Sequence, residues 1–423
     1  MAITLVGERP VNPPKTINPN LKKILLLLSL LGPGLVVMLA DTDAGSIITA
    51  AQSGAAWGYS LVLPQVLLIP ILYFVQEITV RLGIYTRKGH GELIREHFGA
   101  AWAAVSVGTL FLASGGALIT EFAGIAGTGS LFGVPPVLTV GAATLLMVGL
   151  GLTGSYRRLE VVAISFGLFE LAFIPAALLA RPGASFFTGL ASIPVGHPGF
   201  LFMLAANVGA VIMPWMIFYQ QRAVVDRGLT PQDLRPARVD TAIGSVVTQL
   251  VMIAVLVATA ATIGRHQTAP SLDSIQQIAG ALQPVLGATG ARVLFGLGMA
   301  GASFVAALVV SVAGAWGVGE AAGIPHSLNL KFREAPVFYL IYTFTHVAGA
   351  VLVLSGISLV RLTVDIEVMN AMLLPVVLGF LLALEARALA PSCRMCGGYR
   401  LTVWTVSGLI MTFGLYTAVK LFV

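Results

Sequence analysis

The sequence predicts an all-α membrane protein of about eleven transmembrane helices, arranged as two five-helix inverted repeats with one extra C-terminal helix. Of the 423 residues, 57% are hydrophobic and 10% are charged, whereas soluble domains are about 25% charged. Mean hydropathy is +0.92. The apolar residues form continuous runs of bilayer length rather than the alternating pattern of barrel strands. These observations exclude a cytosolic enzyme, a nucleic-acid-binding module and a disordered chain.

Eleven runs are long and apolar enough to cross a bilayer as helices. A polar tail of 23 residues precedes the first run. Since that run lacks a small-residue cleavage site, we interpret it as a retained span and not as a signal peptide. The predicted spans are 24–57, 60–82, 101–127, 135–154, 159–179, 200–219, 242–263, 287–322, 336–358, 366–384 and 401–423.

The basic residues predict the orientation of these spans. Of the 24 Lys and Arg residues, 19 lie in the N-terminal tail or in the loops after the second, fourth, sixth, eighth and tenth spans. Lys and Arg concentrate in cytoplasmic loops. We therefore expect the N-terminus in the cytoplasm and, with an odd number of spans, the C-terminus outside. Short loops and the lack of an organellar address favour the bacterial inner membrane.

Two interruptions divide the chain into repeats. The first span is interrupted at 41–46 (Asp-Thr-Asp-Ala-Gly-Ser) and the sixth at 213–216 (Met-Pro-Trp-Met). Inverted-repeat transporters bind their substrate where the first helix of each repeat is broken, although Gly and Pro are also common in membrane helices that hold no site. The expected units are a cytoplasmic tail (1–23), a first repeat (24–182), a second repeat (198–388) and a loop with the additional helix (389–423).

Two carboxylates lie inside the first interruption. A carboxylate at mid-membrane depth costs several kcal/mol on insertion scales, so it is retained when it is paired, hydrated or functional. Asp41 and Asp43 would point in different directions on an intact helix, whereas an unwound segment lets a carboxylate and backbone carbonyls converge on a cation. The alternative is that one of them caps the second half-helix.

Several motifs follow one another along the first six spans. They are Gly32-Pro33-Gly34, Asp43-Ala44-Gly45-Ser46, Gly58-Tyr59, Arg81-Leu82-Gly83-Ile84, Thr86-Arg87-Lys88-Gly89-His90-Gly91-Glu92-Leu93, Arg157-Arg158-Leu159-Glu160 and Gly209-Ala210-Val211-Ile212-Met213-Pro214. Together they resemble the Nramp (natural resistance-associated macrophage protein) metal-ion transporters. The resemblance implies the LeuT-type, APC-like fold of sodium-coupled amino-acid transporters, uptake of divalent transition metals and proton coupling.

The resemblance also implies a metal site. The family's Asp-Pro-Gly-Asn stretch aligns with residues 43–46, so Asp43 stands at the metal-binding Asp and Ser46 at the metal-binding Asn. The family's span-six ligands fall on Ala210, through its carbonyl, and Met213, through its thioether. A soft thioether favours Mn²⁺, Fe²⁺ or Cd²⁺ over Ca²⁺ and Mg²⁺. The alternative for Met213 is ordinary core packing.

The chain departs from the family where protons are moved. The family's Met-Pro-His-Asn is replaced by residues 213–216 with Trp215 at the His, and the second His is replaced by Gln220. The family's acidic pair in span three aligns with Glu121 and Gly124, so one carboxylate remains. We therefore expect metal flux to carry few or no protons.

Other residues are candidates for the cavity or for coupling. Asp41 and Glu121 are candidates for a titrating or cation-relay role, with helix packing as the alternative for Glu121. Trp215 and Gln220 are expected to line the cavity, where Trp215 either fills volume or contacts an organic ammonium. Glu320, Asp365 and Glu367 are predicted gate or vestibule residues, the last two at an outer mouth.

The remaining motifs bear on cofactors. Cys393 and Cys396 form one Cys-x-x-Cys pair, for which a zinc site would need two further ligands, so an isolated reduced pair is expected. No phosphate-binding loop supports ATP-driven transport. We expect no cofactor. The expected partners are the lipid bilayer and a small cationic substrate, without nucleic acid, and the oligomeric state stays open.

The function predicted from these residues is a secondary transporter or facilitator, and not an enzyme. It would move divalent cations such as Mn²⁺ or Fe²⁺ by alternating access around Asp43, Ser46, Ala210 and Met213. One alternative keeps the fold but carries Mg²⁺ or a small organic amine or amino-acid-like cation. Another is a membrane scaffold or sensor that transports nothing.

Overall fold

The computed structural model describes residues 32–182, 185–263, 272, 274–356 and 359–422. These residues form helices joined by short loops, and no strand occurs among them, so the all-α class is confirmed. The predicted tail (1–23) and the first part of the first span (24–31) lie outside the described residues.

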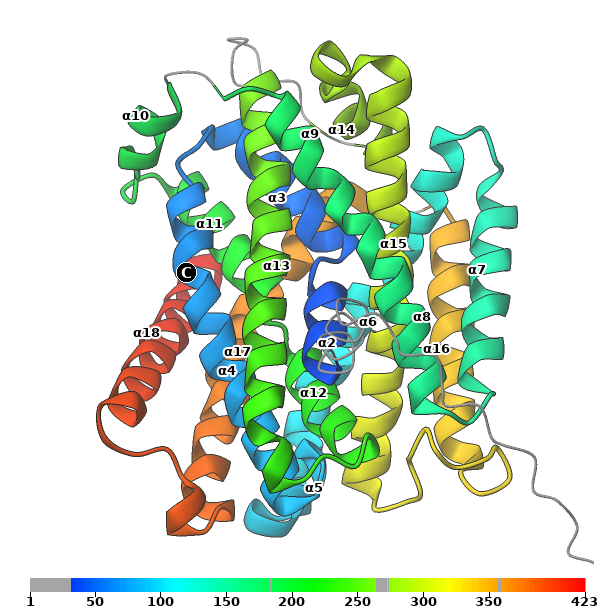
Figure 1. The fold of residues 1–423 in the computed structure, drawn as a ribbon, viewed down its shortest axis with the longest axis vertical. Coiled ribbons are helices and arrows are strands. Elements are labelled where there is room, and N and C mark those ends of the chain that lie inside the picture. The colour runs from blue at the N-terminus through cyan, green and yellow to red at the C-terminus, as the bar shows by residue number, and fades with distance from the viewer. Residues whose placement is uncertain (1–31, 183–184, 264–271, 273, 357–358, 423) are drawn as a thin grey trace, which may run out of the picture.

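The first half of the described chain contains helices that alternate in direction across the molecule (Figure 1). They are α2 (Pro33–Asp41), α3 (Ala44–Trp57), α4 (Val62–Thr86), α5 (His90–Phe98), α6 (Ala100–Leu131), α7 (Pro136–Gly151), α8 (Tyr156–Gly167), the 3-10 turn η1 (Leu168–Ala172) and α9 (Phe173–Leu179). The last three run on as one apolar span, Tyr156–Leu179.

The second half begins with the short helix α10 (Ser185–Ala191). The helices that follow are α11 (Pro198–Val211), α12 (Pro214–Asp226), η2 (Pro231–Asp233), α13 (Leu234–Thr262), α14 (Ile275–Ala281), α15 (Gln283–Ala322), α16 (Pro336–Leu354), α17 (Leu359–Ala388), η3 (Pro391–Cys393) and α18 (Gly397–Phe422). Helix α15 is bent at Gly287, whose φ of 69° is left-handed.

Each predicted span coincides with a helix or a pair of helices. Among the described residues, nine helices are long and apolar enough to cross a membrane, or ten when α2 and α3 count as one bent span. The predicted fourth span is the apolar helix α7, which has 16 residues and is shorter than a usual span. The total of eleven spans therefore stays a prediction.

The first and sixth spans are both broken, as predicted, but the breaks are shorter than expected. Only Thr42 and Asp43 are non-helical between α2 and α3, which meet at 49°. Ile212 and Met213 separate α11 from α12. The predicted interruptions included residues 44–46 and 214–216, which are helical, because Asp43 and Pro214 start new helices at once.

The two broken helices lie at the centre and run in opposite directions (Figure 1). The chain passes from α2 in the lower half to α3 in the upper half, and later from α11 in the upper half to α12 in the lower half. Contacts join α3 to α11 and α2 to α12. Opposite directions are what inverted repeats require, although the domain bounds stay a prediction.

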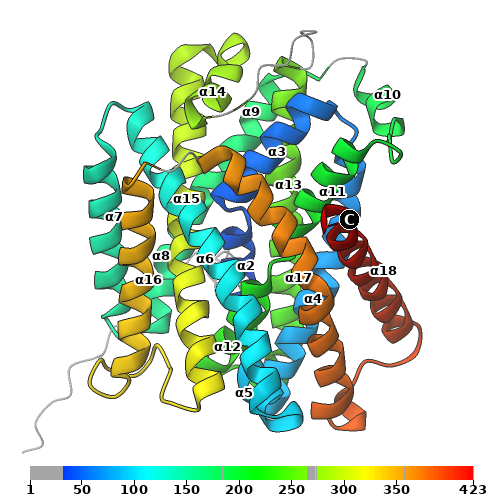
Figure 2. The same cartoon turned by 180° about the vertical axis from the view of Figure 1, so that it is seen from behind.

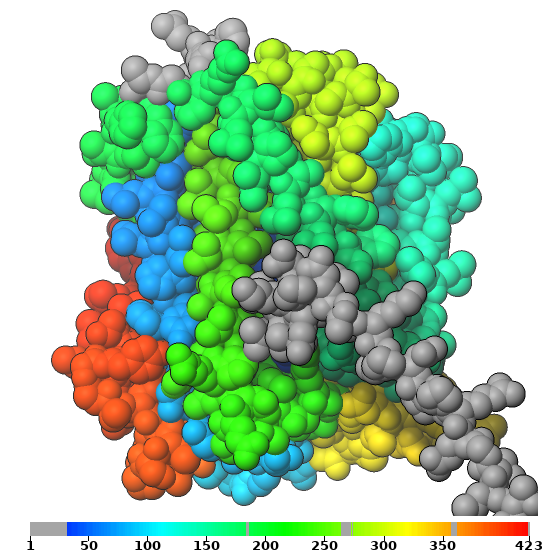
Figure 3. Space-filling model, viewed as in Figure 1, coloured from blue at the N-terminus to red at the C-terminus, as the bar shows by residue number. Residues whose placement is uncertain are grey.

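Long helices surround this central group. Helix α13 packs against α2, α3 and α4, and the surfaces of α4 and α13 lie side by side in Figure 3. On the opposite side, α6 and α17 are in contact, with α16 and α18 toward the edges (Figure 2). Large apolar side chains on outer helices are exposed, including Leu145 (77%) and Phe344 (67%). An apolar exterior around a buried polar centre is typical of a helix bundle in lipid.

Candidate functional site

The two helix breaks meet through a hydrogen bond. The Ser46 hydroxyl donates to the Ala210 carbonyl oxygen over 2.9 Å. About two turns further along α3 and one turn earlier in α11, the Asn207 amide donates to Ser53 Oγ at 2.8 Å. These bonds join segments more than 150 residues apart, which confirms that the interrupted stretches lie together.

Asp43 is fully buried at the first break. Its Oδ1 accepts a hydrogen bond from the Ser46 backbone N–H at 2.6 Å, so Asp43 is the N-cap of α3. Its Oδ2 is buried without a hydrogen-bond partner among the described residues. Capping and cation binding were alternatives in the sequence, but the geometry allows both, because one oxygen caps the helix and the other accepts no hydrogen bond from a backbone or basic group.

Ala210 has a free carbonyl because of a residue four positions later. A helical carbonyl at 210 would accept from the N–H of residue 214, and Pro214 has none. The carbonyl instead accepts from Ser46. A single proline therefore explains both the second break and the backbone oxygen presented at it.

Met213 lies at the second break with its side chain fully buried. The indole N–H of Trp215 donates to Met213 Sδ over 3.2 Å. Trp215 is also fully buried. The predicted metal ligand and the predicted cavity residue are therefore in contact through a hydrogen bond from the indole to the sulfur.

Glu121 reaches the first break from α6. Its Oε2 accepts from the Ala44 backbone N–H at 3.2 Å, and its Oε1 accepts from the Thr120 hydroxyl at 3.1 Å. The Ala44 N–H belongs to the first turn of α3, where a helix attracts negative charge. The Glu121 and Asp43 carboxyl groups thus lie at the same helix end, within hydrogen-bonding reach of each other when one of them is protonated.

Asp41 and Gln220 lie on the side of α13. Asp41 Oδ2 accepts from the Thr248 hydroxyl at 3.3 Å, and its Oδ1 is buried without a partner among the described residues. The Gln220 amide donates to Thr241 Oγ1 at 2.9 Å. Gln220 therefore takes no part in the hydrogen bonds that surround Asp43.

Glu367 lies deeper in the molecule than the sequence predicts. The prediction that Asp365 and Glu367 together line an outer mouth is wrong for Glu367, which is 1% exposed, while Asp365 is exposed. A Cβ added at Gly45 would collide with Glu367 Oε1 and stand 3.2 Å from Asp43 Oδ1. The signal in the sequence was an acid inside an apolar run, but its depth depends on how α17 packs.

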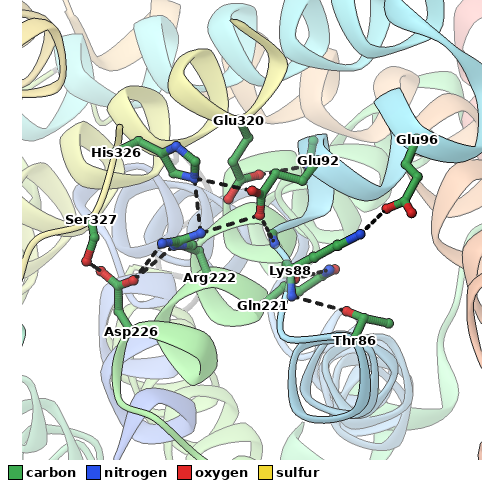
Figure 4. A network of polar contacts seen from close by, with 12 residues as sticks. Thr86, Lys88, Glu92, Glu96, Gln221, Arg222, Asp226, Glu320, His326 and Ser327 are labelled. Atoms are coloured by element: carbon green, nitrogen blue, oxygen red, sulfur yellow. Dashed lines mark hydrogen bonds and ion pairs between the residues drawn. The ribbon is translucent and has the colours of Figure 1, made fainter. Parts of the chain in front are cut away.

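A second polar cluster lies where α5, the end of α12 and the α15–α16 loop meet (Figure 4). Ligand atoms of Glu92, Glu320 and His326 lie within 4.8 Å of one another. Arg222 Nη1 lies 3.0 Å from His326 Nε2 and 3.4 Å from Glu92 Oε2. Burial, together with the positive charge of Arg222, lowers the pKa of His326. Two of the three groups, His326 and Glu92, are thus already paired with Arg222.

The cysteines do not join a metal-binding group in the described part of the chain. Cys393 and Cys396 are both free thiols. The backbone carbonyl of Cys393 accepts a hydrogen bond from Arg81 Nη1 at 2.7 Å. No role for the two thiols follows from this contact.

The fold and its broken helices define the class as an integral membrane transport protein of the LeuT type. The chain belongs to the Nramp family, since a family model described as "Natural resistance-associated macrophage protein-like" matches residues 34–420. The resemblance inferred from the motifs is therefore confirmed.

Relatives support the same membership. The "Divalent metal cation transporter MntH" of Yersinia enterocolitica is 30% identical over 322 residues, covering 73% of this chain and 76% of that protein. The protein of the same name from Yersinia pestis (strain Pestoides F) is 33% identical over 308 residues, covering 70% of this chain and 73% of that protein.

Solved structures show the same fold. A manganese transporter of Eremococcus coleocola, in complex with an aromatic bis-isothiourea substituted compound, matches with a TM-score of 0.76 at 19% identity, covering 95% of this chain and 88% of that one. MhsT in complex with L-phenylalanine matches with a TM-score of 0.58 at 14% identity, covering 91% and 97%. The predicted fold class is confirmed.

Proposed function

We propose that this protein is a secondary transporter or facilitator of divalent transition-metal cations, with Mn²⁺ as the representative substrate. The observation that carries the proposal is the buried, unpartnered Oδ2 of Asp43 beside the bond from Ser46 to Ala210. Relatives that share most of this chain are named divalent metal cation transporters. The protein performs no chemical step on its substrate and needs no resident cofactor.

The metal ligands in this proposal are Asp43 Oδ2, the Ser46 hydroxyl, the Ala210 carbonyl and the Met213 thioether. Three of these are oxygens, which Mn²⁺ accepts readily, and the thioether favours transition metals over Mg²⁺ and Ca²⁺. When the metal binds, it replaces the Trp215 N–H as the partner of the Met213 sulfur. It also replaces the Ser46 hydroxyl as the partner of the Ala210 oxygen.

Transport proceeds by alternating access around the breaks. The joint at Thr42 and Asp43 is a non-helical link in which α2 can tilt relative to α3. The N-terminus of α2 is held by Asp240 of α13, whose carboxylate accepts from the N–H groups of Gly32, Gly34 and Leu35. Release of that contact opens the side on which α2 begins.

The loops that carry most of the basic residues lie at one end of the molecule. The α4–α5, α7–α8, α12–α13, α15–α16 and α17–α18 connections are all at the lower end in Figure 1. Positive charge marks the cytoplasmic side. This end faces the cytoplasm of a bacterial inner membrane in our proposal, with the N-terminus on that side and the C-terminus outside.

Few or no protons accompany the metal in this proposal. A Cβ at Gly124 would collide with the Ser303 hydroxyl, so the second acid of the family's span three has no room here. Gln220, which replaces the second histidine, is held by Thr241 and does not titrate near neutral pH. These two positions support the loss of the proton route.

The experiment is Mn²⁺ uptake into liposomes that contain the full-length protein. We expect Asp43→Asn to abolish uptake, because the amide removes the negative charge while keeping the size of the side chain. The matched control is Glu334→Gln, at an exposed acid in the α15–α16 loop, which should keep parental uptake. Parental uptake by Asp43→Asn, or no uptake of Mn²⁺ or Cd²⁺ by the parent protein, would refute the proposal. Metal-driven acidification of the vesicles would refute its statement on protons.

A further inference from the structure

We infer that Glu367 supplies a second carboxylate to the cation site between the helix breaks, so that the bound divalent ion is held by two carboxylates from different helices. This inference rests on the proposed function and adds a ligand from α17 to it. The aligned metal ligands come from the two broken spans, and Glu367 stands 324 residues after Asp43.

The Glu367 carboxylate lies beside the first helix break. Its Oε1 occupies the space that a side chain at residue 45 would fill, next to Asp43 Oδ1. Residue 45 is Gly, so the α3 backbone leaves that space open. The glutamate therefore lies against the first turn of α3, where Asp43 and Glu121 also bind.

The packing of α17 and a hydrogen bond from Asn370 hold Glu367 in this position. The α17 backbone approaches α11 so closely that a Cβ at Gly209 would collide with the Glu367 carbonyl. One turn later, the Asn370 amide donates to Glu367 Oε2 at 3.0 Å. One carboxylate oxygen is thus fixed by Asn370, and the other is directed toward residue 45.

Glu367 belongs to a group of buried carboxyls around the first break. Electrostatic interactions connect Glu367 with Asp43, Asp41 and Glu121. Within the described residues, no Lys or Arg takes part in the interactions recorded for these four carboxyl groups. Several buried carboxyls without a basic partner are costly at membrane depth. A divalent cation between Asp43 and Glu367 compensates this cost.

Two buried oxygen atoms near the first break lack hydrogen-bond partners among the described residues. The Oδ1 of Asn370 belongs to the amide that holds Glu367, is fully buried and has no partner among the described residues. The Ser303 hydroxyl, next to Ala44 and Gly124, is also buried and unpartnered. Buried oxygen atoms without hydrogen-bond partners are ligands that a hard cation can use.

As a ligand, Glu367 also affects the selectivity of the site between Mn²⁺ and Cd²⁺. Carboxylates favour harder ions such as Mn²⁺, whereas a thioether favours softer ions such as Cd²⁺. Glu367 and Met213 therefore act in opposite senses on the choice between Mn²⁺ and Cd²⁺. A residue that only packed α17 against α3 would affect both ions alike.

The test measures Mn²⁺ and Cd²⁺ binding to the full-length protein in detergent by titration calorimetry. Glu367→Gln keeps the shape and the acceptor for Asn370 but removes the charge. We expect Mn²⁺ affinity to fall about tenfold or more, and Cd²⁺ affinity to fall less. Glu334→Gln, at an exposed acid in the α15–α16 loop, should bind both ions as the parent does.

The outcomes separate this inference from the proposed function. Parental Mn²⁺ affinity in Glu367→Gln, while Asp43→Asn has lost binding, overturns the inference and leaves the function standing. Equal losses for Mn²⁺ and Cd²⁺ assign Glu367 a structural role and also overturn it. Retained binding in Asp43→Asn refutes the function itself. If Glu367→Gln does not fold, Gly45→Ala displaces the same carboxylate, and parental Mn²⁺ affinity in that variant overturns the inference.

Discussion

The two helix breaks are built from opposite kinds of residue. At the first, Asp43 caps α3 with one oxygen and leaves the other free, and Glu121 and Glu367 approach from neighbouring helices. At the second, no side chain carries a charge, and Pro214 frees a backbone carbonyl beside the Met213 sulfur. The first break therefore supplies charge, and the second supplies a neutral oxygen and a soft ligand.

This difference assigns different tasks to the breaks. Charge determines whether a dication enters a buried site at all, because the cost of removing its water must be offset. Neutral and soft ligands decide which dication remains. Variants at the first break should therefore change the affinity for divalent cations. Variants at the second break should change the stability of the fold or the selectivity among these cations.

The largest effect is expected from a pair of glycine variants, one beside each break. In Gly209→Ala the new methyl meets the carbonyl of Glu367 and stands 2.8 Å from the Ala371 nitrogen, and a helix backbone cannot move aside locally. We expect the free energy of unfolding to fall by about 3 kcal/mol, or the protein to fail to fold. In Gly45→Ala the methyl meets the end of a side chain, so the fold should persist while Mn²⁺ binding weakens.

The measurement for this pair is the melting temperature in detergent, followed by Mn²⁺ titration of the protein that folds. Gly108→Ala is the control, because a Cβ there meets nothing within 4 Å. A Gly209→Ala protein as stable as the parent would contradict the close approach of α17 to α11. A Gly45→Ala protein that binds Mn²⁺ normally would contradict the approach of Glu367 to α3.

The half-helices also differ in how their N-termini are held. Asp240 accepts three backbone N–H groups at the start of α2 and is buried. At the start of α11, His197 Nδ1 accepts one N–H, from Gly199, at an exposed position. Asp240→Ala should cost about 2 kcal/mol of unfolding free energy, and His197→Ala no more than about 0.5 kcal/mol. Equal shifts in melting temperature for the two variants would contradict this asymmetry.

The sequence predicted the breaks and the residues that form them better than it predicted what surrounds them. Asp43 and Pro214 act within a few residues along the chain, through an N-cap and a missing N–H, so their effect can be derived locally. The predicted interruptions were too long because the same two residues begin the next helix immediately.

Long-range contacts could not be derived in this way. Glu121 lies against the Ala44 N–H, and Glu367 lies against Gly45, because of how α6 and α17 are tilted and spaced around α3. Hydropathy places an acid along its own helix but does not give the partner helix. The prediction that Glu367 faces an outer mouth failed for this reason, whereas Asp365 on the same helix is exposed.

A selectivity variant sharpens the comparison at the second break. Met213→Ala removes the sulfur, and we expect Cd²⁺ affinity to fall about tenfold while Mn²⁺ affinity falls less, the reverse of Glu367→Gln. Trp215→Phe is the control, because it removes the N–H that holds the sulfur and leaves the sulfur in place. Competitive uptake of Mn²⁺ and Cd²⁺ measures the ratio. An unchanged ratio in Met213→Ala would mean that the thioether is not a ligand.

The smallest predicted effect concerns the pH dependence of folding stability. It tests whether that dependence arises at His90, outside the helix breaks. His90 begins α5, outside the spans, and burial lowers its pKa to about 4. The unfolded chain, with a pKa near 6.5, then binds more protons than the folded protein between those values, so stability falls as the pH falls. The expected loss is about 1 kcal/mol between pH 7 and pH 5.5. His90→Gln should flatten the melting temperature over this range, whereas the exposed His197→Gln should keep the parental slope. A parental slope in His90→Gln would move the source of the pH dependence to other groups, the carboxylates of the first break among them.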